Sequence, residues 1–327
     1  MNILVTGGAG YVGSHAARWL QEAGHDVWVY DNLSTGHHQA VLPDQMIEGE
    51  LCDQPLLERL FSEKAIDVVM HFAASSLVGE SVTDPGKYYR NNVLGSFRLL
   101  EAMRSANVQK LVFSSTTAVY GNPQEVPIHE GLPRCPINPY GWTKYIVEEM
   151  LAHYCHAYGL GYAALRYFNA AGAAADGSIG EDHDPESHLI PLVLQVALGQ
   201  RESITLFGED YPTPDGTCIR DYVHVDDLAR AHQQALDQLQ PGRGWHLNLG
   251  SGSGASVLEV IEACRRVTGH PIPVIHGERR PGDAPILVAD SRQAKEVLQW
   301  EPKFVEIDEI VRSAWRWHQT HPAGYSD

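Results

Sequence analysis

The sequence predicts an α/β fold in which a doubly wound parallel sheet is followed by a smaller mixed α/β lobe toward the C-terminus. Short apolar runs alternate with helix-length segments in the first half of the chain, as in parallel sheets whose strands are joined by helices. The runs are continuously apolar, which is typical of strands buried on both faces. They lie at residues 2–6, 26–30, 68–72, 111–113 and 162–166.

The first run leads directly into a glycine-rich turn, Gly7-x-x-Gly10-x-x-Gly13, and a helical pattern then continues to Gly24. Glycines at this spacing allow a tight turn, let backbone amides approach a pyrophosphate, and let the helix pack closely on the sheet. A turn that binds nothing can have the same glycines. The motif therefore needs its context of strand, helix and a following acid.

Asp31 provides that acid at the end of the second run, 18 positions after Gly13. A carboxylate there accepts hydrogen bonds from an adenosine ribose and repels the 2′-phosphate of NADP. Residues 32–36 contain no Arg or Lys that would favour NADP. The first third of the chain is therefore predicted to be a Rossmann-type domain that binds NAD.

Asn138 and Pro139 predict the start of a helix on which Tyr140 and Lys144 lie one turn apart. A free phenol has a pKa near ~10, too high for a base at neutral pH. A neighbouring ammonium and a positive nicotinamide ring both favour the phenolate, so we expect a lowered pKa for Tyr140 and a role as general base. Tyr-x-x-x-Lys is common by chance on helices, but after a dinucleotide motif it indicates catalysis.

A cluster of hydroxyl side chains, residues 114–117, directly follows the run at 111–113. Ligands of such sheets bind beyond the carboxyl ends of the strands. We expect the Thr116 hydroxyl to bond a substrate oxygen and relay its proton, and Thr117 to cap a turn.

The pattern predicts two domains. Residues 1–169 form the NAD-binding domain, to which residues 221–250 return, and residues 170–327 form the substrate lobe. Residues 170–187 are rich in Gly, Ala and acids and are expected to be loop.

Composition excludes several classes of function. The net charge of −17 disfavours binding to nucleic acid or anionic lipid. No apolar run reaches the ~18 residues of a membrane span, and residues 1–6 do not resemble a signal peptide. Five scattered cysteines without a Cys-x-x-Cys pair indicate a reducing compartment, the cytoplasm. We expect no metal, since the helical pair His153 and His156 is better explained as an exposed helix face.

Several segments form a recognisable set at residues 4–15, 31–34, 71–74, 89–93, 138–141, 165–169, 216–225 and 279–283. Together they resemble the extended short-chain dehydrogenase/reductase family and, within it, the UDP-glucose 4-epimerases, also called UDP-galactose 4-epimerases. The resemblance implies NAD-dependent inversion at C4 of a UDP-hexose through a 4-keto intermediate. It also implies a homodimer paired through helices near residues 92–106 and 139–158.

The family's residue roles carry over by position. The resemblance implies that the catalytic residues are Thr116, Tyr140 and Lys144. The implied cofactor site comprises Gly7, Gly10, Tyr11, Val12, Gly13, Asp31, Asn32, Leu33, Ser34, Thr35, Gly36, Glu50, Leu51, Phe72, Ala73, Ala74, Asn91, Ser114, Tyr140, Lys144, Tyr167 and Phe168. The implied site for the UDP-sugar substrate comprises Thr116, Asn169, His188, Leu189, Thr205, Leu206, Phe207, Arg220, Arg280, Asp283 and Leu287.

The chain departs from the family pattern at three positions outside these segments. Glu50 stands where Asp is common, Ser76 where some members have Lys, and His188 where some have Asn. Leu287 occupies a position that, by the resemblance, sets the width of the sugar pocket; the alternative is that it is a core residue. Leu is smaller than the Tyr of members that exclude N-acetyl sugars, so N-acetylhexosamines are expected as additional substrates.

Two alternative functions remain from the sequence. A nucleotide-sugar 4,6-dehydratase or decarboxylase of the same superfamily has carboxylates where Thr117 and Ala118 stand here, and neither residue can replace them as an acid or base. A non-enzymatic NAD-binding regulator would not need the pair Tyr140 and Lys144.

Overall fold

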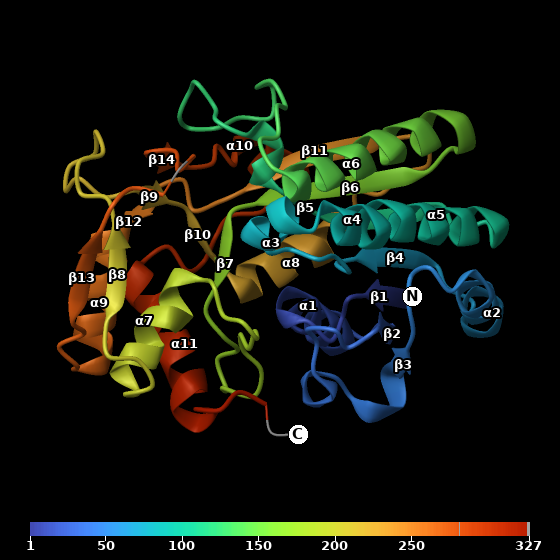
Figure 1. Cartoon of the computed structure of the whole chain (residues 1–327). Coiled ribbons are helices and arrows are strands. Elements are labelled where there is room, and N and C mark those ends of the chain that lie inside the picture. Colours follow the sequence, from blue (N-terminus) through green and yellow to red (C-terminus); the bar gives the residue numbers. More distant parts are fainter. Residues whose placement is uncertain (281, 326–327) are drawn as a thin grey trace.

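The computed structural model describes residues 1–280 and 282–325 and is built around one parallel sheet (Figure 1). The spatial order of its strands is β11-β6-β5-β4-β1-β2-β3, and every neighbouring pair runs parallel. The strands are β1 (Asn2–Thr6), β2 (Asp26–Asp31), β3 (Met46–Glu48), β4 (Val68–His71), β5 (Lys110–Thr116), β6 (Gly161–Tyr167) and β11 (Gly244–Leu249). This sheet confirms the predicted doubly wound fold.

Helices cover both faces of the sheet, as Figure 1 shows. On one face α1 (Tyr11–Glu22) packs beside α8 (Val225–Leu236), with α10 (Arg292–Leu298) against β11. On the other face lie α2 (Gln54–Lys64), α5 (Gly95–Ser105) and α6 (Pro139–Tyr158). A π-helical turn, η3 (Tyr89–Leu94), leads into α5. The remaining short helices of this half are η1 (His38–Ala40), η2 (Pro43–Gln45), α3 (Val78–Thr83), α4 (Pro85–Tyr88) and η4 (Thr117–Tyr120).

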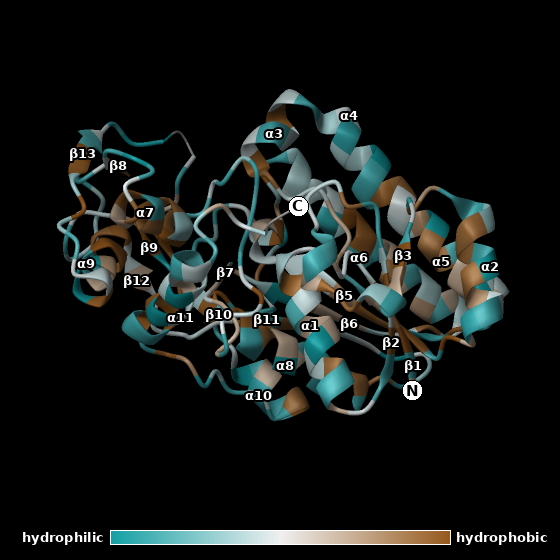
Figure 2. Cartoon of the chain, turned by 90° about the horizontal axis from the view of Figure 1, so that it is seen from below, coloured by the Kyte–Doolittle hydropathy of each residue, from teal (hydrophilic) through white to brown (hydrophobic). Residues whose placement is uncertain are grey.

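Five strands of this sheet (β1, β2, β4, β5 and β6) form where the sequence has a continuous apolar run, and most of their residues are buried. Successive residues of β1 contribute to different cores: Ile3 and Val5 pack on the α1 and α8 side, whereas Leu4 packs on the α2 and α5 side. Figure 2 shows the hydrophobic strands in brown between helices whose outer turns are mostly teal. The apolar runs predicted from the sequence are therefore the centre of a two-sided core.

The second lobe is built from short strands and three helices. Parallel pairs join β7 (Asn169–Ala171) to β10 (Tyr222–His224) and β8 (Ile204–Phe207) to β13 (Val274–Gly277). A third small sheet has the order β12 (Ala255–Ser256), β9 (Ile219–Arg220), β14 (Ile286–Leu287). The helices α7 (Leu189–Ala197), α9 (Val257–Thr268) and α11 (Ile307–Thr320) pack together around a separate apolar core.

The chain crosses between the two halves more than once. It leaves the main sheet after β6, returns with α8 and β11, and leaves again for α9. The predicted loop at residues 170–187 contains the end of β7 and is otherwise irregular. In the described part of the chain, no helix has the length and hydrophobicity needed to cross a bilayer.

A buried ion pair attaches α6 to the sheet. Arg166 on β6 donates from Nε and Nη2 to the two carboxylate oxygens of Glu148 on α6, at 2.8 and 2.6 Å. Ser115 on β5 donates to the same carboxylate at 2.6 Å, and Arg166 also donates to the Tyr120 hydroxyl at 2.7 Å. Burial alone would raise the pKa of Glu148, but the guanidinium holds it below its usual value. The pair thus stays charged inside the protein.

We predict that Glu148→Gln lowers the free energy of unfolding by about 3–5 kcal/mol, because it leaves the Arg166 guanidinium buried without a countercharge. Urea denaturation measures the change. Glu149→Gln is the matched control, since the neighbouring Glu149 pairs with Arg134 at the surface and its loss should cost under about 1 kcal/mol. Equal effects of the two substitutions would show that the buried pair does not anchor α6.

Candidate functional site

Two adjoining pockets lie beyond the carboxyl ends of the strands, where the chain passes from the main sheet to the second lobe. The first extends from the glycine turn after β1 to the start of α6. The second lies between α7, β8 and β9. Asn169, Ala170 and His188 line both, so the pockets are neighbours. The strand order reverses between β1 and β4, the point at which sheets of this kind bind ligands.

The glycine turn is closely packed against the sheet. Gly7 has φ +72°, and a Cβ there would lie 2.4 Å from the backbone nitrogen of Ala73. A Cβ on Gly13 would lie 2.1 Å from the carbonyl oxygen of Gly7. Helix α1 starts after Gly10 with no side-chain cap and no acidic residue in its first turn. Its first N–H groups therefore remain available to an anionic ligand.

Asp31 lies at the end of β2 and is 8% exposed. Its two carboxylate oxygens accept backbone N–H groups of Ala9, at 3.0 Å, and Leu33, at 2.9 Å. Burial raises the pKa of Asp31, and these hydrogen bonds oppose the rise. The bonds hold the carboxylate in place at the wall of the first pocket.

Thr116, Tyr140 and Lys144 all line the first pocket, where β5 ends and α6 begins. Asn138 caps α6 by accepting the N–H of Gly141 at 2.8 Å. A Cβ on Gly141 would lie 2.8 Å from the carbonyl oxygen of Ala118, so glycine lets the helix start approach the end of β5. This close approach brings the phenol of Tyr140 within hydrogen-bonding reach of the Thr116 hydroxyl, and both side chains line the first pocket.

Burial raises the pKa of Tyr140 to about 12, and the Thr116 hydrogen bond offsets this only in part. The prediction that Lys144 lowers the pKa of Tyr140 is therefore wrong for the protein groups by themselves. The Lys144 ammonium turns instead to the carbonyl oxygen of Ser114, to which it donates at 2.8 Å.

Lys144 is a buried cation, 3% exposed. Within the described residues its ammonium forms no ion pair, and its nearest ring is Phe113, with 4.8 Å to the centroid. Burial lowers the pKa of Lys144 to about 7, although Glu148 opposes the shift. An ammonium has three donors, so two are left for a ligand in the pocket.

Most of the predicted cofactor residues line the first pocket. They are Gly7, Gly10, Tyr11, Val12, Gly13, Asp31, Asn32, Ser34, Thr35, Glu50, Leu51, Phe72, Ala73, Ala74, Asn91, Ser114, Tyr140, Lys144, Tyr167 and Phe168. Leu33 does not line it, because with φ +56° its side chain packs against the apolar core instead. Gly36 does not line it either, because it packs closely against Ala9.

Eight of the predicted substrate residues line the second pocket: Asn169, His188, Leu189, Thr205, Phe207, Arg220, Arg280 and Asp283. Leu206 does not, since it is 2% exposed and points into the lobe core. Side chains alternate along a strand, so Thr205 and Phe207 reach the pocket while Leu206 cannot.

The predicted residue Leu287 is also absent from the walls of both pockets. It packs beside Phe168 on a small cluster of Val119, Tyr120 and Ile128. Its register partner in the parallel strand pair is Arg220, which does line the second pocket. Leu287 therefore lies directly behind the wall and not on it.

Three arginines line the second pocket: Arg201, Arg220 and Arg280. Arg220 donates to the carbonyl oxygens of Ile219 and Ala284 at 2.9 and 2.8 Å and lies 3.4 Å from Asp283. The guanidinium of Arg280 lies over the ring of Phe207, 4.0 Å from its centroid. The pocket therefore presents positive charge on a strongly acidic protein, which suits an anionic ligand.

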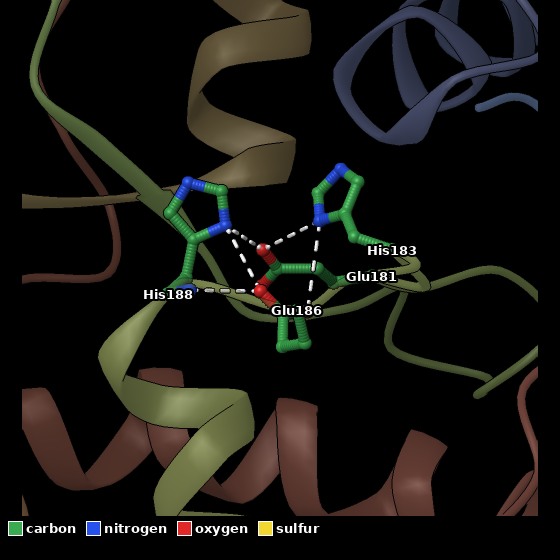
Figure 3. Close-up of side chains that lie close together, drawn as sticks. All are labelled: Glu181, His183, Glu186 and His188. Carbon is green, nitrogen blue, oxygen red and sulfur yellow. Dashed lines mark hydrogen bonds and ion pairs between the residues drawn. The ribbon is translucent and has the colours of Figure 1, made fainter. Parts of the chain in front are cut away.

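Sequence reasoning missed Arg201, which follows α7, and a group of four side chains in the loop after β7. The group consists of Glu181, His183, Glu186 and His188, of which only His188 was predicted (Figure 3). Burial alone would lower the pKa of both imidazoles, but the carboxylates raise that of His183 to about 9 and that of His188 to about 10. The spacing Glu-x-His-x-x-Glu-x-His is the signal that could have indicated the group.

Comparison with known proteins gives the family. The model of the NAD dependent epimerase/dehydratase family matches residues 3–250. The UDP-glucose 4-epimerase of Halalkalibacterium halodurans is 55% identical over 328 residues, which cover 100% of this chain and 98% of that protein. The chain belongs to the UDP-glucose 4-epimerase family.

Solved structures of this epimerase family have the same fold. A crystal structure of a UDP-glucose 4-epimerase superposes with a TM-score of 0.98 at 51% identity and covers 100% of both chains. The enzyme from Bifidobacterium longum, in complex with NAD⁺ and UDP, superposes with a TM-score of 0.94 at 38% identity and covers 99% of this chain and 100% of that chain.

The first pocket fits NAD, the cofactor of this epimerase family. Gly7 and Gly13 let the turn pack tightly on its own backbone, and the first N–H groups of α1 are left for a pyrophosphate. The Asp31 carboxylate at the end of β2 suits ribose hydroxyls, and the buried ammonium of Lys144 has donors to spare. These features are complementary to the phosphates and sugars of a dinucleotide.

We predict that Lys144→Met stabilises the nucleotide-free protein at pH 7 by about 1–4 kcal/mol. The pKa of Lys144 is near ~10.4 in the unfolded chain and about 7 in the folded protein. The unfolded chain therefore binds the proton more tightly, and protonation of Lys144 opposes folding. The cost is fully present below pH 7 and disappears as the pH rises toward ~10.4, so the advantage of Met should shrink over this window. Urea denaturation at several pH values measures it.

Lys110→Met is the control, since Lys110 is a partly exposed lysine at the start of β5. Its effect should stay within about 0.5 kcal/mol at every pH. A Lys144→Met protein less stable than the parent at pH 7 would contradict the buried-cation interpretation.

Proposed function

We propose that Thr116, Tyr140 and Lys144 carry out the C4 inversion of a UDP-hexose, with UDP-glucose and UDP-galactose as the substrate pair. The reaction is that of the epimerase family, and it passes through a 4-keto sugar. The observation that carries the assignment is that Thr116, Tyr140 and Lys144 line one cofactor pocket, which adjoins the arginine-lined second pocket. Incubation with UDP-galactose and with UDP-N-acetylgalactosamine, followed by identification of the products, tests it.

The first pocket holds NAD through the glycine turn, Asp31 and Lys144. When bound, NAD supplies a hydride acceptor and donor and a positive ring beside the phenol. Tyr140 takes the proton of the sugar 4-hydroxyl on its phenolic oxygen, with the Thr116 hydroxyl orienting the two groups, and returns it after the inversion. Lys144 orients the cofactor ribose and adds a positive charge near the phenol. The raised pKa of Tyr140 means that it depends on positive charge brought by the ligand.

The second pocket holds the UDP group. Arg220 and Arg280 bind the diphosphate, since a guanidinium matches phosphate oxygens well. Asn169 and His188 line both pockets, which places them where the sugar would meet the cofactor. Arg201 adds a third cation to the same pocket.

The two alternative functions have less support. Thr117 and Ala118 form the start of η4, and Thr117 uses its hydroxyl to donate to the carbonyl oxygen of Tyr167 at 3.4 Å. Neither supplies the acid or base that a 4,6-dehydratase or decarboxylase needs at these positions. A regulator without activity leaves unexplained why Thr116, Tyr140 and Lys144 line the same pocket.

We also propose that two copies of the chain pair through α5 and α6. Large apolar side chains are exposed along this face, and burying them would favour association. They include Tyr89, Leu94, Phe97, Trp142 and Tyr158. The exposed free thiols of Cys52 and Cys135 suit a reducing compartment, for which we propose the cytoplasm.

We predict that Tyr140→Phe lowers kcat by about 10²–10⁴-fold, the usual contribution of a general base, while the affinity for NAD changes only a few-fold. The reason is that only the hydroxyl is lost and the ring still packs. Steady-state kinetics and a cofactor titration measure the two quantities. Tyr145→Phe, on the same helix, should leave both near the parent values, and a Tyr140→Phe enzyme with kcat within tenfold of the parent would remove Tyr140 from the mechanism.

We predict that Leu287→Tyr selectively suppresses epimerisation of UDP-N-acetylglucosamine. A larger ring behind the wall would push Phe168 or Arg220 toward the ligands, and pocket shape discriminates a small group by about 1–3 kcal/mol. The parent should accept UDP-N-acetylglucosamine less well than UDP-glucose, and the ratio of kcat/KM for the two sugars measures the change. Ile286→Tyr, whose side chain points to the other face of β14, is the control. If the ratio of kcat/KM for the two sugars is the same in Leu287→Tyr and in the parent, this residue does not set the width of the sugar pocket.

A further inference from the structure

The loop between β7 and α7 brings four ionisable side chains to one point. Glu181, His183, Glu186 and His188 each offer one ligand atom, and the four atoms lie within 4.8 Å of one another. Figure 3 shows both imidazole rings directed at carboxylates that lie between them. The group borders both pockets, since His183 lines the first, Glu181 the second, and His188 both.

The distances inside the group are short enough for the four side chains to close around one metal ion after small shifts of the side chains. His183 Nδ1 lies 3.3 Å from Glu181 Oε1 and 3.6 Å from Glu186 Oε2. His188 Nδ1 lies 2.7 Å from Glu181 Oε1 and 3.3 Å from Glu186 Oε1. Zinc binds His nitrogen and carboxylate oxygen at about 2.0–2.2 Å, and four such ligands in a tetrahedron are about 3.3–3.5 Å apart.

Two buried atoms of the group have ion-pair contacts but no hydrogen bond of good geometry. They are Glu181 Oε1 and His183 Nδ1, which face each other across 3.3 Å. Glu181 is 4% exposed. A cation between this oxygen and this nitrogen would give both buried atoms a directional partner.

Backbone hydrogen bonds position one of the ligands. Glu186 Oε1 accepts the backbone N–H groups of Ser187, at 2.6 Å, and His188, at 2.8 Å. Bonds of this kind orient a metal ligand. Without a metal, the two imidazoles balance the two carboxylates as ion pairs. A divalent cation would take the place of the two imidazole protons and keep the same balance of charge.

We propose that Glu181, His183, Glu186 and His188 form a binding site for one divalent transition-metal ion, with Zn²⁺ as the preferred ion. Two imidazoles and two carboxylates favour zinc over Mg²⁺ or Ca²⁺, which take oxygen ligands alone. Four protein ligands make a closed site, which is the structural type and not the catalytic one. The ion ties the loop after β7 to the first turn of α7, between the cofactor pocket and the nucleotide pocket.

The test uses the full chain without a histidine tag, treated with EDTA and freed of the chelator. Titration with Zn²⁺ by calorimetry should give about one site per chain with micromolar or tighter affinity. Titration with Co²⁺ should give the intense visible absorption of a tetrahedral site. Zn²⁺ should also raise the melting temperature, because an ion that binds only the folded state stabilises it.

Glu181→Gln and His183→Gln should each weaken Zn²⁺ binding by more than about 100-fold, because loss of a direct ligand should cost more than the ~10–100-fold that loss of an outer-shell partner costs. The double variant His153→Gln/His156→Gln is the matched control, since it removes two exposed histidines of α6. Circular dichroism in the presence of EDTA, together with a measurement of NAD binding, shows whether each variant is folded. If Glu181→Gln does not fold, the test depends on His183→Gln, which changes a less buried side chain.

Three outcomes overturn the proposal. The first is a parent protein that does not bind Zn²⁺, which means that protons alone neutralise the carboxylates. The second is loss of binding in the α6 control, and the third is full affinity in a folded His183→Gln protein. None of these readouts depends on epimerase activity, so failure of the metal site is distinguishable from failure of the assigned function.

Discussion

The buried pair of Glu148 and Arg166 is the interaction on which the site geometry depends. Helix α6 carries both Tyr140 and Lys144, and its position on the sheet is set by a bidentate contact from β6 together with the Ser115 hydroxyl of β5. Such a pair is costly to bury, and packing by apolar residues would hold a helix as well or better. The directional hydrogen bonds also fix how α6 is rotated about its axis and where it lies along the sheet, so that its first turn meets the end of β5.

Burial is the second constraint, and it acts in opposite directions on the two ionisable groups of α6. It raises the pKa of Tyr140 to about 12 and lowers that of Lys144 to about 7. Both shifts favour the uncharged forms, so the protein groups alone do not create a phenolate. The pocket is thus poised to respond to charge that a ligand brings, which couples binding to the readiness of the base.

Charge is distributed unevenly around the two pockets. The chain carries a net charge of −17, yet three arginines line the second pocket and the buried Lys144 lies in the first. Between them lies the acidic and imidazole group of the loop after β7, whose two carboxylates are held close together. Cations are therefore available to an anionic ligand in either pocket, and between the pockets lies a group in which two imidazoles pair with two carboxylates.

The sequence alone determined five strands of the main sheet, the glycine turn, Asp31 and the helix that carries Tyr140 and Lys144, because each depends on residues close together in the chain. Continuous apolar runs identify buried strands, and Tyr140 and Lys144 share a helix face by spacing alone. Only the tertiary structure decided that Leu206 and Leu287 lie off the pocket walls, that Arg201 lines one, and that Glu181, His183, Glu186 and His188 converge. These depend on how an irregular loop folds and on which face of a short strand meets its neighbour, and neither leaves a periodic pattern in the sequence.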